Sequence, residues 1–402
     1  MLDGWILAAT PWIALPTVVA LRMRGHVTLD QYALNGDAGG GTHGDPQTVA
    51  DRPPAVSIVL PARNEARNIA ECLAAIRESH WTDFELIVVD DHSTDGTGDL
   101  ARRAAAGDAR IRIIDAPDLP AGWFGKQWAC HSAVQHARGN VLVFTDADTR
   151  HGPELLARSL NAMRERRADL LSVIGTQVLE SFWERLLMPQ VFVLLLSRYG
   201  NTEVMSRSTN PRSKIANGQY FMITRAAYDR VGGHAAVRDH VAEDLRIAQE
   251  ACRRGASVQI VDGREHLRVR MYEGLGEFMR GWEKNVYAGG RDTFPEGRIV
   301  RALVRALYPL PAMWNVVPFV LGLVAAFGAL PPQVLWWAGL CYAASAVFWV
   351  ATSIQSRVAS WYGLLHPLAS AMLTVLFTRA AVRGDRVQWK GREYRSASAQ
   401  LT

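Results

Sequence analysis

Cysteine is scarce in this sequence, with four residues in a chain of 402. Cys72, Cys130, Cys252 and Cys341 are scattered and show neither a pairing pattern nor the spacing of metal ligands. A disulfide framework and a cysteine-ligated zinc site are therefore disfavoured. The pattern instead fits a domain that works on a reducing, cytosolic face.

Three signatures of nucleotide or nucleic-acid binding are also missing. No Gly-x-Gly-x-x-Gly follows the first predicted strand, and no Gly-x-x-x-x-Gly-Lys-Ser/Thr loop occurs. No lysine and arginine run with interleaved aromatics indicates DNA or RNA binding, so nucleic acid is not an expected partner. The formal charge of +5 largely accompanies apolar segments, which is typical of a protein at a membrane surface.

Long apolar segments are present near both ends of the chain. Residues 5–21 carry no charge and are followed by Arg22 and Arg24, whereas a cleaved signal peptide carries its positive charge before the apolar run. We therefore predict an uncleaved membrane anchor at 1–24, with the following domain in the cytoplasm. Three more stretches approach spanning length, at 307–330, 334–354 and 361–378.

One of these stretches is expected not to cross the membrane. An anchor and three further spans would leave the basic tail, 379–402, outside, although positive charge prefers the cytoplasm. Residues 307–330 contain three prolines, so this stretch is the candidate for a re-entrant or interfacial segment. The sequence thus predicts a multi-pass protein of the cell membrane with membrane helices within 307–378 and a cytoplasmic catalytic domain.

The region between the apolar ends divides into a linker and an α/β domain. Residues 25–54 are rich in Gly, Asp, Thr and Pro and show no apolar period, which predicts a linker. From residue 55, short apolar strands alternate with helical segments, which predicts a mainly parallel sheet covered on both faces. We place this domain at 55–275 and an interfacial segment at 276–306.

Charged side chains follow the predicted strands at one edge of the sheet. Arg63 and Glu65 follow the strand at 56–60, Asp91 follows the strand at 84–89, and Asp146 follows the strand at 141–145. Ligands of open α/β sheets bind outside the carboxyl ends of the strands. Asp146 and its neighbour Asp148 would therefore offer oxygen ligands to Mg²⁺ or Mn²⁺, with substrate phosphates completing the shell. Alone, an Asp-x-Asp tripeptide is better explained as part of an ordinary turn or helix cap, and the motifs below favour the functional interpretation.

Taken together, these segments resemble the family 2 glycosyltransferases of the GT-A fold. The matching pieces occur in the family's order at 56–65, 88–97, 125–126, 145–148, 217–220 and 243–244. The resemblance implies a doubly wound mixed α/β sheet and a nucleotide-sugar site formed by Pro61, Ala62, Arg63, Glu65, Asp91, Lys126 and Asp146. It implies a divalent metal, Mg²⁺ or Mn²⁺, on Asp146 and Asp148. It also implies acceptor or sugar contacts at Gly218, Gln219, Glu243, Arg280 and Trp282.

Asp244 is the candidate catalytic base. In the resembling enzymes the aspartate of the Glu-Asp pair has this role, because inverting transfer needs a carboxylate to take the acceptor's proton. The metal and Lys126 would stabilise the departing diphosphate. In isolation, Glu243 and Asp244 are better explained as acidic residues that favour a helix N-terminus, and the preceding motifs reverse this preference.

Two shorter motifs narrow the resemblance. Residues 278–282 read Phe-Met-Arg-Gly-Trp and depart from the Gln-x-x-Arg-Trp of processive polysaccharide synthases. The pieces at 122–126 and 270–272 look like those of glycosyltransferases associated with carotenoid and hopanoid pathways. We expect an inverting enzyme that moves a hexose from a nucleotide sugar, with a UDP-sugar favoured, to a hydroxyl of a membrane lipid such as a polyisoprenoid.

Several alternatives stay open from the sequence. The acceptor could instead be ceramide, diacylglycerol or a polysaccharide, and a catalytically silent membrane scaffold is the rival of another class. The segment at 180–196 fits either a core helix or an interfacial helix that guides a lipid. Residues 201–214 are expected to form a loop over the site, and Thr94 or Asp95 to cap the next helix. His266 could approach the metal, although an ordinary surface histidine fits as well.

Overall fold

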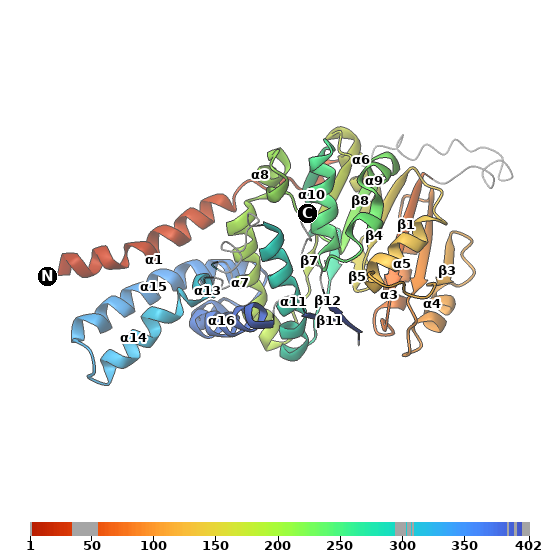
Figure 1. Ribbon diagram of the computed structural model, residues 1–402. Coiled ribbons are helices and arrows are strands. Elements are labelled where there is room, and N and C mark those ends of the chain that lie inside the picture. The colour runs from red at the N-terminus through yellow and green to blue at the C-terminus, as the bar shows by residue number, and fades with distance from the viewer. Residues whose placement is uncertain are drawn as a thin grey trace. The chain divides into compact units, whose positions relative to one another are not determined.

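The computed structural model describes residues 2–33, 55–293, 303, 307, 309–383, 386–389 and 392–395. The chain forms two compact units, each with its own packing (Figure 1). The α/β unit comprises residues 26–178, 202–271 and 385–402. The helical unit comprises residues 1–25, 179–201 and 272–384.

A seven-stranded sheet forms the centre of the α/β unit, with the strand order β3-β2-β1-β4-β8-β6-β9. Its strands are β1 (Val56–Ala62), β2 (Phe84–Asp90), β3 (Ile111–Asp115), β4 (Val141–Thr145), β6 (Leu170–Ile174), β8 (Tyr220–Thr224) and β9 (Val258–Asp262). β8 runs antiparallel to β4 and β6, while the other pairs are parallel. The predicted doubly wound mixed sheet is confirmed.

Helices cover both faces of this sheet, which explains why most residues of its central strands are apolar and buried. The helices of the unit are α3 (Ile69–Arg77), α4 (Thr97–Ala105), α5 (Gly125–Val134), α6 (Leu155–Glu165), α8 (Thr202–Arg207), α9 (Arg225–Val231) and α10 (Glu243–Arg253). Successive side chains of a strand point to opposite faces. Accordingly, Ile58 packs in a core cluster with Leu73 of α3, and Val59 packs in a second cluster with Ile247 of α10.

A small second sheet follows the carboxyl ends of β4 and β6 in sequence. It consists of β5 (Thr149–His151), β10 (Leu267–Val269) and β7 (Thr176–Gln177), with β10 in the middle. β10 pairs antiparallel with β5 and parallel with β7. The turn at 146–148 therefore connects a strand of the large sheet to a strand of the small one, which holds it at both ends.

The start of the predicted linker belongs to the folded α/β unit. The wholly buried Leu29 lies in the short 3-10 helix η1 (Leu29–Gln31), and Tyr32 is nearly buried as well. The amide of Asp262 donates to the carbonyl of Val27 at 2.8 Å. The prediction of a linker from residue 25 is therefore corrected for residues 26–32, and residues 34–54 lie outside the described residues.

The expected loop at 201–214 is largely helical. Residues 202–207 form α8, and Pro211–Ser213 form the 3-10 helix η2. The ammonium of Lys214 is buried and donates to the carbonyls of Met205, Ser206 and Val258 at 2.7–3.0 Å. These bonds attach the segment to the sheet, so the prediction of a loop over the site was wrong here.

The predicted helix cap after β2 was also wrong. The N-cap residue of α4 is Gly96, with φ of 87°, and no side chain caps the helix there. Asp95 instead accepts from the amides of Thr97 and Ala66 at 3.1 and 3.0 Å. The aspartate therefore stabilises the loop before α4 rather than the helix itself.

Among its described residues, the helical unit contains three helices that are long and apolar enough to cross a membrane: Gly4–Arg22, Pro332–Gln355 and Ser360–Arg383. Its elements are α1 (Leu2–Arg22), α7 (Phe182–Tyr199), α11 (Leu275–Thr293), α13 (Leu310–Met313), α14 (Val316–Ala326), α15 (Pro332–Gln355), η4 (Ser360–Leu365) and α16 (His366–Arg383). In the stretch 307–330, α14 has only 11 residues. It is therefore too short to span, as the prolines led us to expect.

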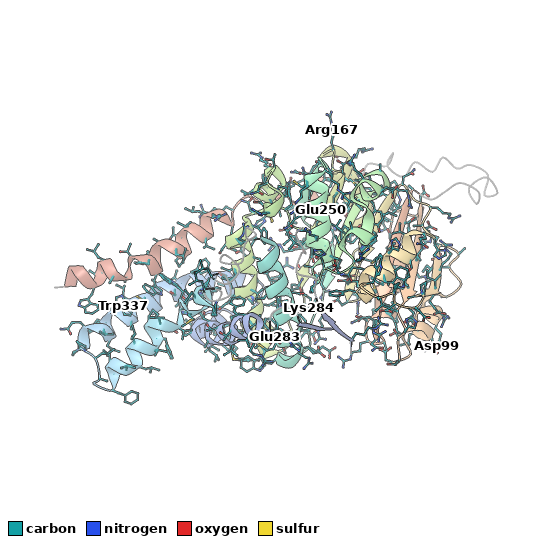
Figure 2. The ribbon with its side chains drawn as sticks, viewed as in Figure 1. Asp99, Arg167, Glu250, Glu283, Lys284 and Trp337 are labelled. Atoms are coloured by element: carbon teal, nitrogen blue, oxygen red, sulfur yellow. The ribbon has the colours of Figure 1, made fainter. Side chains whose placement is uncertain are left out.

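Buried aromatic and polar contacts hold these helices together. Trp12 of α1 stacks on Trp314 and meets Trp337 of α15 edge-on (Figure 2 labels Trp337). Gln190 of α7 donates to the carbonyl of His366 and accepts from Ser370 of α16. α7 is thus part of the helical unit, which argues against its reading as a core helix of the α/β domain.

Candidate active site

Lys126 joins three elements of the α/β unit at the carboxyl edge of the sheet. Its Nζ lies 2.7 Å from Oδ1 of Asp146, directly after β4, and 2.7 Å from Oε1 of Glu243, the first residue of α10. The amide of Phe124, the residue before α5, donates to the carbonyl of Arg238 at 2.8 Å. This bond brings the start of α5 to the segment before α10, so the lysine reaches both carboxylates.

Gly218 allows Asp244 to approach this cluster closely. The Gly218 amide donates to Oδ2 of Asp244 at 2.6 Å, and the amide of Leu245 donates to Oδ1 at 2.7 Å. A Cβ atom at position 218 would lie 2.9 Å from Oδ2 of Asp244 and 3.1 Å from Nζ of Lys126. Any other residue would therefore push the aspartate or the lysine away.

The electrostatic balance of the cluster is negative. Asp146, Glu243 and Asp244 carry three negative charges against the single positive charge of Lys126, which leaves −2 when all are ionised. Burial opposes the charged ammonium, but attraction by the three carboxylates outweighs it and raises the pKa of Lys126 well above its usual value. The lysine therefore stays protonated.

The carboxylates of the cluster differ in their affinity for protons. Burial favours the neutral acid of Glu243, yet the adjacent Lys126 outweighs burial and lowers the pKa. At Asp146 burial outweighs the lysine and raises the pKa. Burial, with repulsion from Glu243, raises the pKa of Asp244 to about 6. Asp244 is thus ionised at neutral pH but can take up a proton at little cost, as general bases require.

A buried hydroxyl network supports the turn at Asp146 and Asp148. Thr149 Oγ1 donates to the carbonyl of Asp146 at 2.7 Å, and Thr145 Oγ1 donates to the carbonyl of Gln219 at 2.9 Å. The ring Nε2 of His151 lies 2.9 Å from Thr145 Oγ1. Burial lowers the pKa of His151 to about 3, so the ring is neutral. Sequence reasoning missed these residues, although two threonines flank the Asp-x-Asp motif.

The donor set at this turn fits a hard divalent cation. Asp146 and Asp148 supply carboxylate oxygens, and Oδ1 of Asp148 is buried. Within the described ranges, no group of three or more His, Cys, Asp or Glu residues could hold a metal by itself. This suits Mg²⁺ or Mn²⁺ bound by one or two carboxylates and by substrate phosphates and water. Nε2 of His266 instead lies 2.8 Å from Oδ1 of Asp30, within hydrogen-bond distance.

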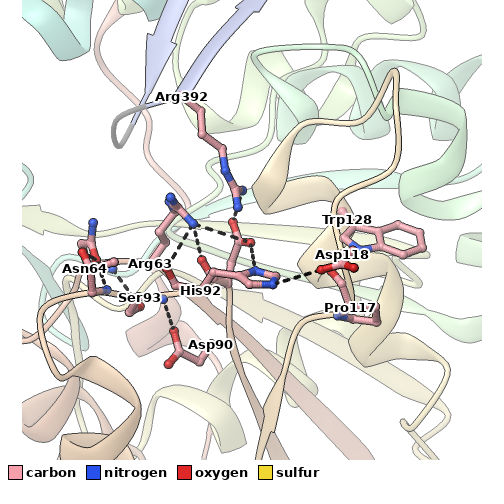
Figure 3. A network of polar contacts seen from close by, with 11 residues as sticks. Arg63, Asn64, Asp90, His92, Ser93, Pro117, Asp118, Trp128 and Arg392 are labelled. Carbon is pink, nitrogen blue, oxygen red and sulfur yellow. Dashed lines mark hydrogen bonds and ion pairs between the residues drawn. The ribbon is translucent and has the colours of Figure 1, made fainter.

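A second group of predicted residues gathers at the ends of β1 and β2. The nitrogen of Pro61 cannot donate, and pairing of β1 with β4 ends at Val59. The carbonyl of Ala62 accepts from the amide of Asp91 at 2.8 Å. Arg63 donates to the carbonyls of Asp91 and His92 (Figure 3). These bonds hold the two strand ends together.

The loop after β1 is locked to the loop after β2. Asn64, with φ of 51°, receives a bond at its side chain from the amide of Thr94. The amide of Glu65 donates to Thr97 Oγ1 at 2.8 Å, and its carboxylate accepts from Asn68 at 3.1 Å. Glu65 is therefore held in place beside the strand ends.

The buried carboxylate of Asp91 lies beside two arginines and one histidine. Its Oδ2 lies 2.7 Å from Nη1 of Arg392, and its Oδ1 lies 3.2 Å from Nδ1 of His92. Nη1 of Arg63 is 3.9 Å from Oδ1. Sequence reasoning did not foresee Arg392 at this place, because nothing local in the basic tail points to Asp91.

The other predicted acceptor residues are Gln219, Arg280 and Trp282. The side chain of Gln219 is nearly buried and accepts from Gln177 and Asn217 at 3.1 and 3.0 Å, so it supports the segment before β8. Arg280 and Trp282 lie on α11 in the helical unit and not among the residues of the α/β unit.

The family match and the named relatives of this chain both indicate a glycosyltransferase. Residues 57–232 match the family described as Glycosyl transferase family 2. A 4,4'-diaponeurosporenoate glycosyltransferase of Staphylococcus aureus (strain USA300) is 26% identical over 357 residues, covering 86% of this chain and 90% of the relative. The protein of the same name from strain MRSA252 is 26% identical over 359 residues. These matches confirm the resemblance that the motifs indicated.

A solved structure shows the same fold. It is a mannosyltransferase from Pyrobaculum calidifontis in complex with GDP-Man and Mn²⁺, with a TM-score of 0.54 and 18% identity. The likeness covers 95% of this chain and 98% of that one. The family match contains the site residues from Pro61 to Gln219 but ends before Glu243 and Asp244, whose assignment depends on the geometry around Lys126.

Proposed function

We propose, from the premise that residues 57–232 are a family 2 glycosyltransferase domain, that this protein is an inverting hexosyltransferase of the membrane. It moves a hexose from a nucleotide sugar to a hydroxyl of a membrane lipid with a long apolar body. The observation that carries the proposal is the cluster in which Lys126 joins Asp146 and Glu243 beside Asp244.

Asp244 acts as the general base in this proposal. Its carboxylate takes the proton of the acceptor hydroxyl while that oxygen bonds to the anomeric carbon of the hexose. The bond from that carbon to the diphosphate breaks, and its electrons leave with the nucleoside diphosphate. A single displacement from the opposite side inverts the anomeric centre. The bond from the Gly218 amide orients Oδ2 of Asp244 for this step.

Lys126 stabilises the charge that develops on the leaving diphosphate. Its permanently protonated ammonium lies between Asp146 and Glu243, where it needs no reorganisation during the reaction. A divalent cation, when bound by Asp146 and Asp148, supplies Lewis-acid stabilisation of the diphosphate. Mg²⁺ and Mn²⁺ both suit these oxygen ligands.

The ends of β1 and β2 form the nucleoside side of the donor site. Asp91 is placed to accept from the base or ribose, and Pro61, Ala62, Arg63 and Glu65 line the same edge. A UDP-sugar is the favoured donor. Gly218, Gln219 and Glu243 belong to the sugar side, and Arg280 and Trp282 are proposed as acceptor contacts from the helical unit.

The acceptor is proposed to be a carotenoid-like or other polyisoprenoid lipid. The relatives are named for a diaponeurosporenoate, and three helices in the described part of this chain are long and apolar enough to cross a bilayer. Ceramide and diacylglycerol are the alternative acceptors for the same donor site. The silent scaffold is disfavoured because a partly buried cluster with net negative charge is costly, and a scaffold gains nothing from it.

The proposed membrane topology is based on the three candidate spans among the described residues. The α/β unit contains residues between the first span, α1, and the second, α15, together with the segment after the third, α16. Two crossings separate these parts, so both lie on one side of the membrane. The positive charge of Arg22, Arg24 and the basic tail supports a cytoplasmic location for that side.

A donor screen on detergent-purified protein tests the proposal. Binding of UDP-glucose, UDP-galactose, UDP-N-acetylglucosamine and GDP-mannose is measured with Mn²⁺ and with chelator, followed by transfer to a hydroxylated polyisoprenoid. We expect metal-dependent binding of one donor and an inverted glycoside as product. Absence of binding by every donor, in protein shown to be folded, would contradict the proposal.

A further inference from the structure

The basic tail contributes a two-stranded ribbon to the α/β unit. β11 (Arg386–Trp389) and β12 (Arg392–Arg395) pair antiparallel, with Trp389 opposite Arg392. The segment 385–402 groups with the α/β unit, although the helical unit precedes it in sequence. A two-stranded ribbon is marginally stable by itself. Its contacts with the domain therefore decide whether it stays docked.

Arg392 makes the contact of this ribbon that reaches the donor site. Its guanidinium points toward Asp91, and Nη1 donates to Oδ2 at 2.7 Å (Figure 3). The two residues are 301 positions apart in sequence. The side chain of Asp91 is 3% exposed and that of Arg392 is 22% exposed. The arginine thus lies on the solvent side of the carboxylate and covers it.

A nucleoside would use the same carboxylate oxygens. Bases and riboses offer N–H and O–H donors, and a guanidinium offers N–H donors of the same kind. In the structure, Oδ2 of Asp91 accepts from Arg392, and Oδ1 lies beside His92. Because so little of the Asp91 side chain is exposed, a nucleoside reaches it only when Arg392 moves away.

We propose that the β11–β12 ribbon is a gate over the nucleoside subsite, with Arg392 as its latch on Asp91. The inference rests on the proposed function, because it takes Asp91 as a nucleoside contact. Latched ribbon and bound nucleoside are mutually exclusive, so the ribbon acts as a built-in competitor of the donor. Its closure lowers the apparent donor affinity by the fraction of molecules in which the latch is engaged.

The test uses UDP with Mn²⁺ as the probe and full-length, detergent-solubilised protein. Arg392→Ala is expected to bind UDP about three- to tenfold more tightly than wild type, since a partly exposed ion pair holds the latch. Arg392→Lys keeps the charge but loses the planar fork and is expected to fall between the two. The matched control is Arg207→Ala on α8, which removes a 79% exposed arginine paired with Glu203 and leaves UDP binding unchanged.

A second readout follows the ribbon itself. Amide hydrogen exchange of 386–395 is expected to quicken when UDP binds to wild type, because the latch is released. Equal or weaker UDP binding by Arg392→Ala, or unchanged exchange on saturation with UDP, would overturn the gate. Absence of UDP binding in both proteins would overturn it as well.

The two proposals fail in different ways. If the enzyme transfers hexose but the Arg392→Ala substitution changes neither UDP affinity nor hydrogen exchange of the ribbon, the proposed transferase activity is supported and the gate is contradicted. Tighter UDP binding by Arg392→Ala without hexose transfer to any lipid hydroxyl would instead support the gate and contradict the proposed transferase activity.

Discussion

The α/β unit holds two acidic sites with opposite electrostatic balance. Around Lys126 three carboxylates share one ammonium, so negative charge is in excess. Around Asp91 one carboxylate lies beside two guanidinium groups, those of Arg63 and Arg392, and beside the ring of His92. The first site is suited to take up a cation or a proton, whereas the second is already satisfied by the protein. A ligand that binds Asp91 must displace one of its present partners in the protein. At the Lys126 cluster, the excess negative charge is available to bind a cation or to accept a proton.

Asp244→Asn removes one negative charge from the Lys126 cluster and tests whether this carboxylate is the proton acceptor. The amide keeps the shape of the side chain but cannot accept a proton, so we expect hexose transfer to fall about 10³-fold. Donor binding should be retained, because Asp91 and the metal ligands are untouched. Transfer is measured in single turnover and donor binding by calorimetry. If donor binding is lost instead, Asp244 is not the base.

Asp148→Ala removes an oxygen ligand from the proposed metal site. We expect metal-dependent binding of the donor to weaken about 10²-fold, since few protein ligands hold such a cation. Binding is measured with Mn²⁺ and with chelator, and the two values should converge in the variant. The exposed Asp99→Ala on α4 serves as the control for loss of one negative charge. Donor binding that stays metal-dependent in Asp148→Ala would remove this residue from the metal site.

Gly218→Ala disturbs the cluster by a single methyl group. The new Cβ would lie 2.9 Å from Oδ2 of Asp244, so the base must shift, and we expect transfer to fall about 30-fold. Gly274→Ala is the matched control, because its Cβ would meet no atom within 4 Å. Thermal unfolding shows whether each variant is folded. Normal transfer by a folded Gly218→Ala protein would show that the base tolerates displacement.

The pH dependence of transfer is expected to show the smallest effect of the four. It separates the two sites, because transfer involves the base Asp244 whereas UDP binding does not. The pKa of Asp244 is raised to about 6, and the ionised form is the active one. Above about pH 6 the kcat/KM of transfer should therefore be level, and below it should fall about tenfold for each pH unit. UDP binding over the same range is the comparison, since it does not involve the base. A kcat/KM that stays level down to pH 5 would exclude Asp244 as the titrating base.

Much of the fold could be predicted from local pattern. The apolar strands β1, β2 and β4 were located within one or two residues, because a strand buried on both faces reads as a continuous apolar run. The loop at 201–214 was predicted incorrectly. Its polar residues hide α8. The ammonium of Lys214 is buried because two carbonyls of the same segment, those of Met205 and Ser206, and the distant carbonyl of Val258 accept its hydrogen bonds.

The candidate site could be predicted in composition but not in arrangement. The ordered motifs brought Asp146, Glu243 and Asp244 to attention, and the structure places the first two within 2.7 Å of Lys126. The steric demand at Gly218 could not be read from the sequence, because it depends on the approach of α10 to the strand β8. The supporting threonines and His151 were missed for the same reason.

The sequence by itself determined the apolar ends, the strand and helix pattern and the acidic residues at the strand ends, because each depends on side chains near one another along the chain. Only the tertiary structure decided which charges meet. The pairing of Lys126 with Glu243 and of Arg392 with Asp91 joins segments far apart in the sequence. Such contacts depend on how the folded chain brings distant segments to one edge of the sheet, and the spacing of residues along the sequence does not predict this.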